Sequence, residues 1–211
     1  MRRYVLASCA AIGCFAMSLP TLAAEDEARF EVTPFAAYRG GGEFSDTDSD
    51  SKVELPESNA WGLTVNGSVS PYTEWEVLWS RQLTDVDASD SVGPQTSFPM
   101  RVDYLHFGGT YLLEGEKVRP FIALTIGATR FDPGLPGLSG KTYGSMSFGA
   151  GWKFYFGEHV GLRLEARGFG TLIDSSSRLF CESDGGGACL IVAKGEVLTQ
   201  FEARAGFSIR F

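Results

Sequence analysis

The last eleven residues of the chain alternate strictly between apolar and polar side chains. One set of alternate positions is apolar and the other is charged, polar or glycine: Phe201, Ala203, Ala205, Phe207, Ile209 and Phe211 against Glu202, Arg204, Gly206, Ser208 and Arg210. A period of two is typical of a β-strand, in which successive side chains point to opposite faces of the sheet. At least three other segments show the same pattern. The sequence therefore predicts an all-β fold whose sheet has one apolar face and one polar face.

The N-terminus has the features of a secretory signal peptide. Arg2 and Arg3 precede an apolar stretch from Val5 to Leu19, and the small residues Ala23 and Ala24 stand before acidic Glu25. We therefore predict a signal peptide over residues 1–24 and one exported domain over residues 25–211. After residue 24 no stretch approaches the roughly 20 apolar residues that a spanning helix needs. The exported domain is predicted either to be soluble or to cross a membrane as a barrel of strands.

The alternating segments predict eight strands joined by connections of alternating length. The predicted strands cover residues 29–39, 59–70, 74–83, 101–113, 117–131, 143–156, 160–173 and 195–211. Short turns near residues 72, 115 and 158 alternate with longer connections. This rhythm is typical of an up-and-down barrel in the outer membrane, with short turns and termini on the periplasmic side and long loops outside. We predict an eight-stranded antiparallel transmembrane β-barrel, apolar outside and polar inside, which leaves no open sheet edge in the bilayer.

Net charge and cysteine content give two further constraints on the exported domain. Removal of Arg2 and Arg3 with the signal peptide leaves 16 basic residues against 26 acidic ones. A protein with this excess of negative charge is a poor partner for nucleic acid. Two of the four cysteines also lie in the signal peptide, and Cys181 and Cys189 remain. An isolated pair in an exported chain predicts a disulfide that closes a small loop.

Charged residues occupy many of the positions predicted to face the barrel interior. They are Arg29, Glu31, Glu76, Lys153, Arg163, Glu165, Arg167, Glu202, Arg204 and Arg210. An eight-stranded barrel is only wide enough to be filled by side chains, and buried charges are costly unless they are paired or hydrated. Our hypothesis is an ion-pair network that plugs the lumen. The alternative is a narrow aqueous channel lined by the same charges, and a conduit for apolar solutes is disfavoured by them.

Aromatic residues near the predicted strand ends indicate two girdles at the bilayer surfaces. The candidates are Trp75, Trp79, Tyr104, Tyr111, Trp152, Tyr155, Phe156 and Phe211. Aromatic residues are also favourable in strands generally. Their position in the barrel decides whether they form girdles or are ordinary strand residues.

The sequence offers little evidence for catalysis or for a cofactor. His159 falls in a predicted turn, and His106 lies within a strand with no serine placed beside it by sequence spacing. No Gly-x-Ser-x-Gly elbow is present, and the glycine triplets at 40–42 and 185–187 lack the following helix that a phosphate site requires. We predict no enzyme activity, no cofactor and no metal site.

One acidic segment in the first long connection is a weak candidate for calcium binding. Asp46, Asp48, Asp50 and Glu57 match part of a calcium loop, but Ser51 stands where the glycine is required and no helices flank the segment. A solvated acidic loop is the simpler interpretation, and the sequence does not decide between them.

The terminal Phe211 and the stretch Gly161-Leu162-Arg163-Leu164-Glu165-Ala166-Arg167-Gly168 resemble the small eight-stranded outer-membrane barrels, such as the transmembrane domain of OmpA and OmpX. The resemblance implies a monomer in the outer membrane of a Gram-negative cell, with Phe211 as the signal for the barrel-assembly machinery. It implies contact with lipid and lipopolysaccharide, and an extracellular ligand could bind the acidic loops. We expect no peptidoglycan-binding domain. The implied role is structural or surface interaction; the alternatives are a small porin-like channel and, less favoured, a lipid-modifying enzyme.

Overall fold

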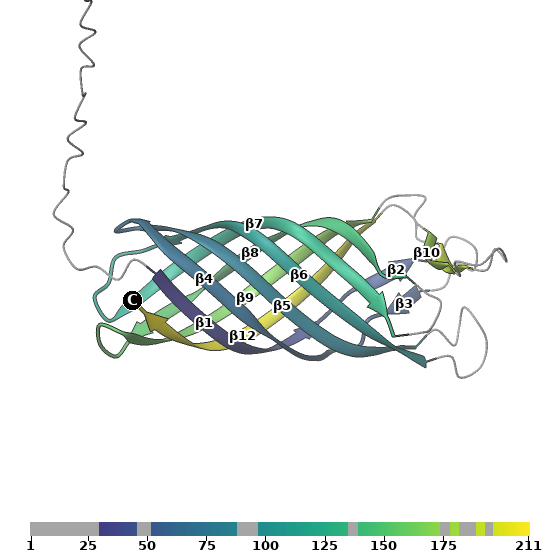
Figure 1. Cartoon of the computed structure of the whole chain (residues 1–211), viewed down its shortest axis with the longest axis horizontal. Helices are drawn as coiled ribbons and strands as arrows, with labels where there is room; N and C mark the ends of the chain where they lie inside the picture. The colour runs from purple at the N-terminus through teal and green to yellow at the C-terminus, as the bar shows by residue number, and fades with distance from the viewer. Residues whose placement is uncertain are drawn as a thin grey trace, which may run out of the picture.

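The computed structural model describes residues 30–45, 52–87, 97–134, 139–173, 178–181, 189–192 and 196–211. Eight strands form a closed barrel (Figure 1), and every neighbouring pair in it is antiparallel. They are β1 (Phe30–Gly40), β4 (Ser58–Ser70), β5 (Thr73–Asp87), β6 (Ser97–Leu112), β7 (Val118–Pro133), β8 (Lys141–Tyr155), β9 (Val160–Ile173) and β12 (Glu196–Arg210). The predicted eight-stranded antiparallel barrel is confirmed. The predicted signal peptide lies outside the described residues and stays a prediction.

The two ends of the barrel differ. The chain enters and leaves at one end, which also carries the short turns and is called the turn end here (Figure 1). The other end, the loop end, carries two small hairpins: β2 (Glu43–Ser45) with β3 (Lys52–Glu54), and β10 (Arg178–Cys181) with β11 (Cys189–Val192). At the turn end, the Phe211 N–H donates to the Phe30 carbonyl at 2.9 Å and the Phe30 N–H donates back at 3.3 Å. The first and last described residues thus close the seam between β1 and β12.

Strands β5 and β6 are longer than the sequence pattern indicated. Their pairing continues from Thr73↔Tyr111 to Asp87↔Ser97, whereas residues 84–100 were predicted to be a loop. The outward residues of this extension are polar or proline, which conceals the strand pattern. Its inward residues Val86, Phe98 and Met100 are buried. The wall therefore extends further at the loop end than predicted.

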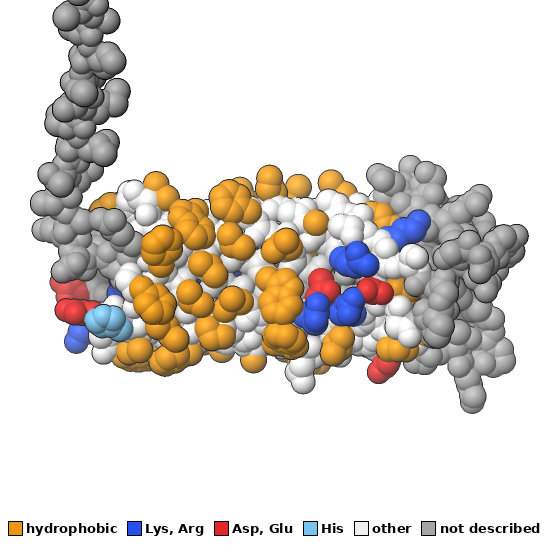
Figure 2. Space-filling view, viewed as in Figure 1, with side chains coloured by type: hydrophobic (Ala, Val, Ile, Leu, Met, Phe, Trp, Pro, Cys, Tyr) orange, Lys and Arg blue, Asp and Glu red, His pale blue; other side chains and the backbone are white. Residues whose placement is uncertain are grey.

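A broad apolar belt surrounds the outside of the barrel (Figure 2). Leu124, Ile126 and Phe148 are 63, 68 and 56 % exposed. Isolated exposed apolar residues are normal in soluble proteins, but a continuous belt marks a surface that another apolar phase covers. Other large members of the belt are Trp61, Leu105, Phe107, Ile122, Met146, Trp152, Leu164, Leu172, Val197, Phe201 and Phe207. Within the described segments, no helix is long and apolar enough to cross a bilayer.

Pro34 lies within β1, where a proline removes one donor from the ladder. Its partner on the β4 side is Leu63, but the β1–β12 pairs pass from Val32↔Ile209 directly to Phe35↔Gly206. The missing donor therefore falls on the β12 side. Beside it, the hydroxyl groups of Thr33 and Ser208 are 2.8 Å apart and hydrogen-bonded, so a contact between side chains joins the two strands where the backbone ladder is interrupted.

The apolar belt gives a direct test of the lipid-facing surface. We expect Leu124→Arg, near the middle of the belt, to lower the free energy of unfolding by about 2–4 kcal/mol, because an arginine at the bilayer midplane must be desolvated. Val69→Arg, near the turn end of β4, should cost no more than about 1 kcal/mol, as at the bilayer interface. The measurement is denaturant unfolding of the barrel in vesicles. Equal, small effects of both substitutions would contradict a lipid-covered belt.

Candidate functional site

The interior of the barrel contains a charged layer toward the turn end. Of the described residues, ten charged side chains are buried, each at most 8 % exposed, and they comprise five cations and five carboxylates. The cations are Arg39, Lys153, Arg163, Arg167 and Arg204, and the carboxylates are Glu31, Glu74, Glu76, Glu165 and Glu202. They reach the interior because they occupy the inward positions of a period-two wall. The layer is formally neutral.

The centre of the charged layer joins three arginines to two glutamates. Arg163 bridges Glu76 and Glu165, with N–O distances of 2.7 Å to each. Arg167 also bridges both carboxylates, at 2.6 Å to each. Arg204 adds a contact of 2.5 Å to Glu165. Each carboxylate oxygen thus receives at least one charged donor, which is the condition for burying such groups without a large desolvation penalty.

Two smaller groups of charges flank this centre. Toward the turn end, the Lys153 ammonium lies 2.9 Å from Glu31 and 2.7 Å from Glu74. Toward the loop end, Arg39 pairs with Glu202 at 2.5 Å and donates to the Ser80 hydroxyl. The charged layer therefore consists of three groups of ion pairs, and the Arg39 group adjoins the centre where Arg204 Nη1 lies 3.9 Å from Glu202 Oε1.

A glycine makes room for the central pairs. A Cβ atom at Gly149 would lie 2.3 Å from Glu165 Oε1 and 3.0 Å from Arg167 Nε. A real Cβ could not occupy that position, so even alanine would displace the pair. Gly149 is thus a packing requirement of the ion pair rather than a turn residue.

Toward the loop end the interior is largely apolar, which the sequence pattern did not indicate; the buried polar side chains there include Gln82 and Gln200. The buried cluster consists of Phe35, Leu55, Leu78, Val86, Phe98, Met100, Val102, Tyr104, Phe131, Tyr143, Phe169, Ile173 and Leu198. The placement of Tyr104 in an aromatic girdle is wrong, because its side chain is fully buried in this cluster. The Arg39 guanidinium lies 4.7 Å from the Tyr104 ring centre and 5.1 Å from that of Phe169. Arg39 therefore forms the boundary between the two layers.

His106 is buried near this boundary and makes two side-chain hydrogen bonds. Its Nε2 atom is 2.8 Å from the Ser145 hydroxyl and its Nδ1 atom is 3.0 Å from the Thr125 hydroxyl. Sequence spacing placed no serine beside His106; Ser145 is distant in sequence and is brought there by the fold. A catalytic triad orients the second ring nitrogen with a carboxylate; here the contact is a threonine hydroxyl. The pair satisfies a buried imidazole and lacks the geometry of a triad.

Eight of the ten predicted lumen charges are buried inside the barrel: Glu31, Glu76, Lys153, Arg163, Glu165, Arg167, Glu202 and Arg204. Arg210 is half-buried near the turn end, with its guanidinium 4.3 Å from the ring centre of Tyr155. Phe211 is 67 % exposed beside the seam. Arg29 lies outside the described residues.

Two members of the charged layer, Arg39 and Glu74, were not predicted. Arg39 shares the inward set of alternate positions with Glu31 on β1, and Glu74 shares it with Glu76 on β5. Both stand at the limit of a predicted strand, where the period of two gives the least support. Carrying the inward set of alternate positions to the terminal residue of each predicted strand identifies them.

The cysteine and calcium predictions remain untested. The backbone register of β10 and β11 places Cys181 directly opposite Cys189. Opposed residues in an antiparallel pair have Cα atoms about 4.5–5.5 Å apart, a separation that a disulfide can span.

Asp46, Asp48 and Asp50 lie outside the described residues. Among the residues that are described, no group of three or more His, Cys, Asp or Glu side chains is arranged to hold a metal ion.

The central ion pairs predict a large effect of one substitution. We expect Glu165→Gln to lower the free energy of unfolding by about 3–5 kcal/mol, because three buried arginines lose a shared carboxylate. The matched control is Glu57→Gln, since Glu57 is exposed and accepts a hydrogen bond from Tyr38 at 2.9 Å. It should change stability by no more than about 0.5 kcal/mol. Denaturant unfolding in detergent micelles measures both. Equal stability of Glu165→Gln and the parent would show that the network is not structural.

The barrel resembles several solved structures, although no curated protein matches the sequence. Among solved structures, Neisserial surface protein A is similar at 13 % identity and TM-score 0.59, covering 86 % of this chain and 97 % of its own. OprG from Pseudomonas aeruginosa is similar at 14 % identity and TM-score 0.58, covering 87 % of this chain and 96 % of its own. AlkL, solved in lipid bilayers, is similar at 15 % identity and TM-score 0.54, covering 100 % of this chain and 97 % of its own. These likenesses show the fold. The family model described as the outer membrane protein beta-barrel domain matches residues 7–211, so the chain belongs to this family of outer-membrane β-barrels.

Proposed function

We propose that this protein is an outer-membrane barrel with a closed lumen and acts through its loop end, in a structural role or in surface interaction. The observation that carries the closed lumen is the charge balance of the interior, five cations against five carboxylates, all buried. Charges that line a water-filled pore can be hydrated by water and neutralised by mobile ions. Charges that fill a narrow lumen must neutralise one another.

The two interior layers act as successive barriers. The charged layer fills the turn-side interior with long side chains, in a barrel whose lumen is only as wide as its side chains. The layer toward the loop end is largely apolar, and its buried amides are already hydrogen-bonded: Gln200 Nε2 donates to Gln82 Oε1 at 3.2 Å, and the Tyr104 hydroxyl donates to Gln200 Oε1 at 2.8 Å. Few polar groups are therefore left to replace the hydration shell of an ion along the path to the loop end. A hydrated ion would have to break buried ion pairs and also enter an apolar core.

A small porin-like channel is the alternative, and one observation favours it. Between the two layers, in the described part of the chain, Arg39 Nη1, Glu202 Oε1 and Arg204 Nη1 are buried without a hydrogen-bond partner. Arg204 Nη1 and Glu202 Oε1 are 3.9 Å apart, and a bridging water would satisfy both atoms. A hydrated position there is where a continuous water path would begin.

Conductance decides between the closed lumen and the channel. We expect the refolded barrel to give no discrete current steps in a planar bilayer, since both layers exclude hydrated ions. A heat-dependent shift on a gel confirms folding, and a known porin added to the same bilayer confirms that the method detects channels. Reproducible steps from the folded protein, altered in ion selectivity by Glu76→Gln, would overturn the closed lumen.

Because the proposed lumen is closed, we place the function of the protein at its outer surfaces. We place the loop end outside the cell and the turn end, with Phe211 available to the barrel-assembly machinery, in the periplasm, as is general for such barrels. The first connection, which joins β1 to β4 at that end, is rich in acidic residues in the sequence, Asp46, Asp48 and Asp50 among them. A basic extracellular partner is the class that this charge favours.

A charge-matched pair of variants tests the loop end. Cells that display the protein should bind a labelled polylysine peptide, and Asp46→Asn with Asp48→Asn and Asp50→Asn should weaken that binding. The control removes three acidic charges at the turn end: Glu114→Gln, Glu116→Gln and Glu158→Gln. It should leave binding unchanged, because the periplasmic end is inaccessible on intact cells. Weaker binding by the turn-end variant alone would reverse the proposed orientation, and unchanged binding by both would exclude an interaction through this acidic segment.

A further inference from the structure

A second group of charges lies on the outside of the barrel wall, toward the loop end. In the strand register, Arg81 on β5 stands beside Asp103 on β6, which stands beside Arg130 on β7. In the next row toward the loop end, Arg101 on β6 stands beside Asp132 on β7. Blue and red side chains lie next to the apolar belt in Figure 2. We call these five residues the outer ladder.

The aspartates of the outer ladder are engaged by its arginines. Arg81 donates to both oxygens of Asp103, at 2.6 and 3.1 Å, and Arg101 Nε lies 3.2 Å from the same carboxylate. Asp132 pairs with Arg101 and, at 3.8 Å, with Arg130. The side chains of Arg101 and Arg130 are still 40 and 52 % exposed. Three guanidinium groups offer more donors than two carboxylates accept, so the exposed remainder is a set of N–H groups with an excess of one positive charge.

The outer ladder lies at the edge of the belt. The row below it contains Trp79 and Leu105, and Leu105 is 59 % exposed. Trp79 packs edge-to-face against Trp61 at 5.0 Å, and the Arg81 guanidinium lies 5.3 Å from the Trp79 ring centre. Tryptophan is typical of the bilayer interface, where an apolar phase meets polar headgroups. The outer ladder therefore lies at the level of the headgroups.

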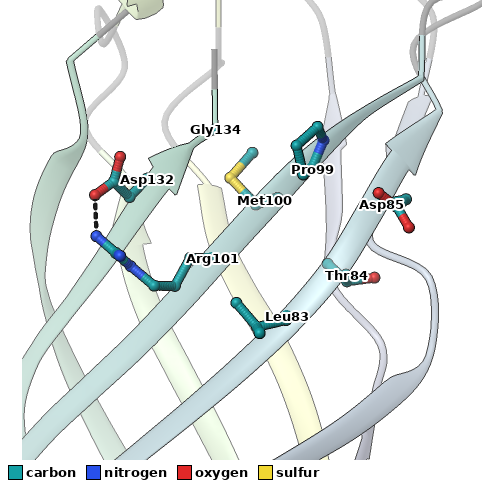
Figure 3. Close-up of a pocket in the computed structure, with 8 residues that line it drawn as sticks. All are labelled: Leu83, Thr84, Asp85, Pro99, Met100, Arg101, Asp132 and Gly134. Atoms are coloured by element: carbon teal, nitrogen blue, oxygen red, sulfur yellow. Dashed lines mark hydrogen bonds and ion pairs between the residues drawn. The ribbon is translucent and has the colours of Figure 1, made fainter. Parts of the chain in front are cut away.

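A hollow of about 360 Å³ adjoins the outer ladder. Figure 3 shows its lining: Leu83, Thr84 and Asp85 from β5, Pro99, Met100 and Arg101 from β6, and Asp132 and Gly134 from β7. Leu83 is 61 % exposed, so the hollow presents an apolar surface beside a guanidinium. Asp85 adds a negative charge to the lining. In the strand register it stands opposite Pro99, two positions beyond the Leu83↔Arg101 row, so it lies farther from the belt than Arg101 does.

We propose that the outer ladder binds the phosphate groups of lipopolysaccharide in the outer leaflet. Arg101 and Arg130 donate to phosphate oxygens, for which the planar guanidinium fork is well suited. Leu83 and Pro99 contact the adjoining sugar or acyl part of the same molecule. The assignment of this lipid rests on the proposed orientation, because only then does the outer ladder face the outer leaflet.

A divalent cation is a poorer fit to this site. A metal requires carboxylate oxygens that are free to coordinate it, whereas Asp103 and Asp132 both accept from arginines. Phosphate requires the opposite, exposed donors with an excess of positive charge. The outer ladder provides these at the level where lipid phosphates lie.

The test is native mass spectrometry of the folded mature barrel in detergent with bisphosphorylated lipid A. We expect Arg101→Gln with Arg130→Gln to weaken binding about tenfold or more, since charged hydrogen bonds are lost. The matched control is Arg119→Gln, because Arg119 is a partly exposed arginine at the turn end that donates to the Pro71 carbonyl at 2.7 Å. It should leave binding unchanged. Equal binding by all three proteins would overturn the proposal.

Further binding measurements identify the ligand and control for misfolding of the double variant. Dephosphorylated lipid A should bind the parent as weakly as the double variant binds the phosphorylated lipid; equal binding of both lipids would overturn the role of phosphate. Full competition by millimolar inorganic phosphate, or equal binding of phosphatidylglycerol, would overturn lipopolysaccharide as the ligand. If the double variant fails to fold, Arg130→Gln alone, whose ion pair is the longest in the outer ladder, should show the loss. Binding in detergent requires neither a closed lumen nor an orientation, so its failure is distinct from failure of the proposed function.

Discussion

The interior of this barrel depends on one constraint: each buried charge needs an opposite partner within contact distance. A carboxylate or guanidinium removed from water costs several kcal/mol unless another charge and further hydrogen bonds replace the solvent. Glu165 meets this condition with three arginines, and Glu76 with two. Because successive side chains point to opposite faces, a slip of one residue in β9 would turn Arg163, Glu165 and Arg167 outward. The ion pairs therefore select the register of the wall as well as fill it.

The same pairs connect strands that are not neighbours in the wall. β5 and β9 are separated by β6, β7 and β8, yet Arg163 and Arg167 of β9 both reach Glu76 of β5. Lys153 similarly joins β8 to β1 and β5 through Glu31 and Glu74. Hydrogen bonds between adjacent strands hold the wall closed but permit it to flatten. Contacts across the lumen resist flattening, so a charged interior stiffens the cross-section in a way that an apolar belt cannot.

The sequence predicted the wall well and the contacts inside it poorly. The period of two identified all eight barrel strands and placed Glu76, Arg163 and Glu165 on the inner face, because strand geometry makes orientation a local property. Which charge meets which depends on the order and stagger of distant strands. That is why Ser145 beside His106 was missed. The apolar layer was missed for a related reason: inward Val86, Phe98 and Met100 lie in strand extensions whose outward residues resemble a loop.

Arginine and acidic residues occur on both faces of the wall, and their surroundings give them opposite properties. Inside, Arg163 and Arg167 are 2 % exposed and each pairs with two glutamates, so little capacity remains for a ligand. Outside, Arg130 is half-exposed and its contact with Asp132 is long, so its donors remain available. Mutual neutralisation fits the inner charges for a structural element, and incomplete neutralisation leaves the outer ones with exposed donors, as the proposed binding site requires. In the proposed function the interior charges are used for stability, so the interactions of the barrel are carried out from its lipid-facing and loop surfaces.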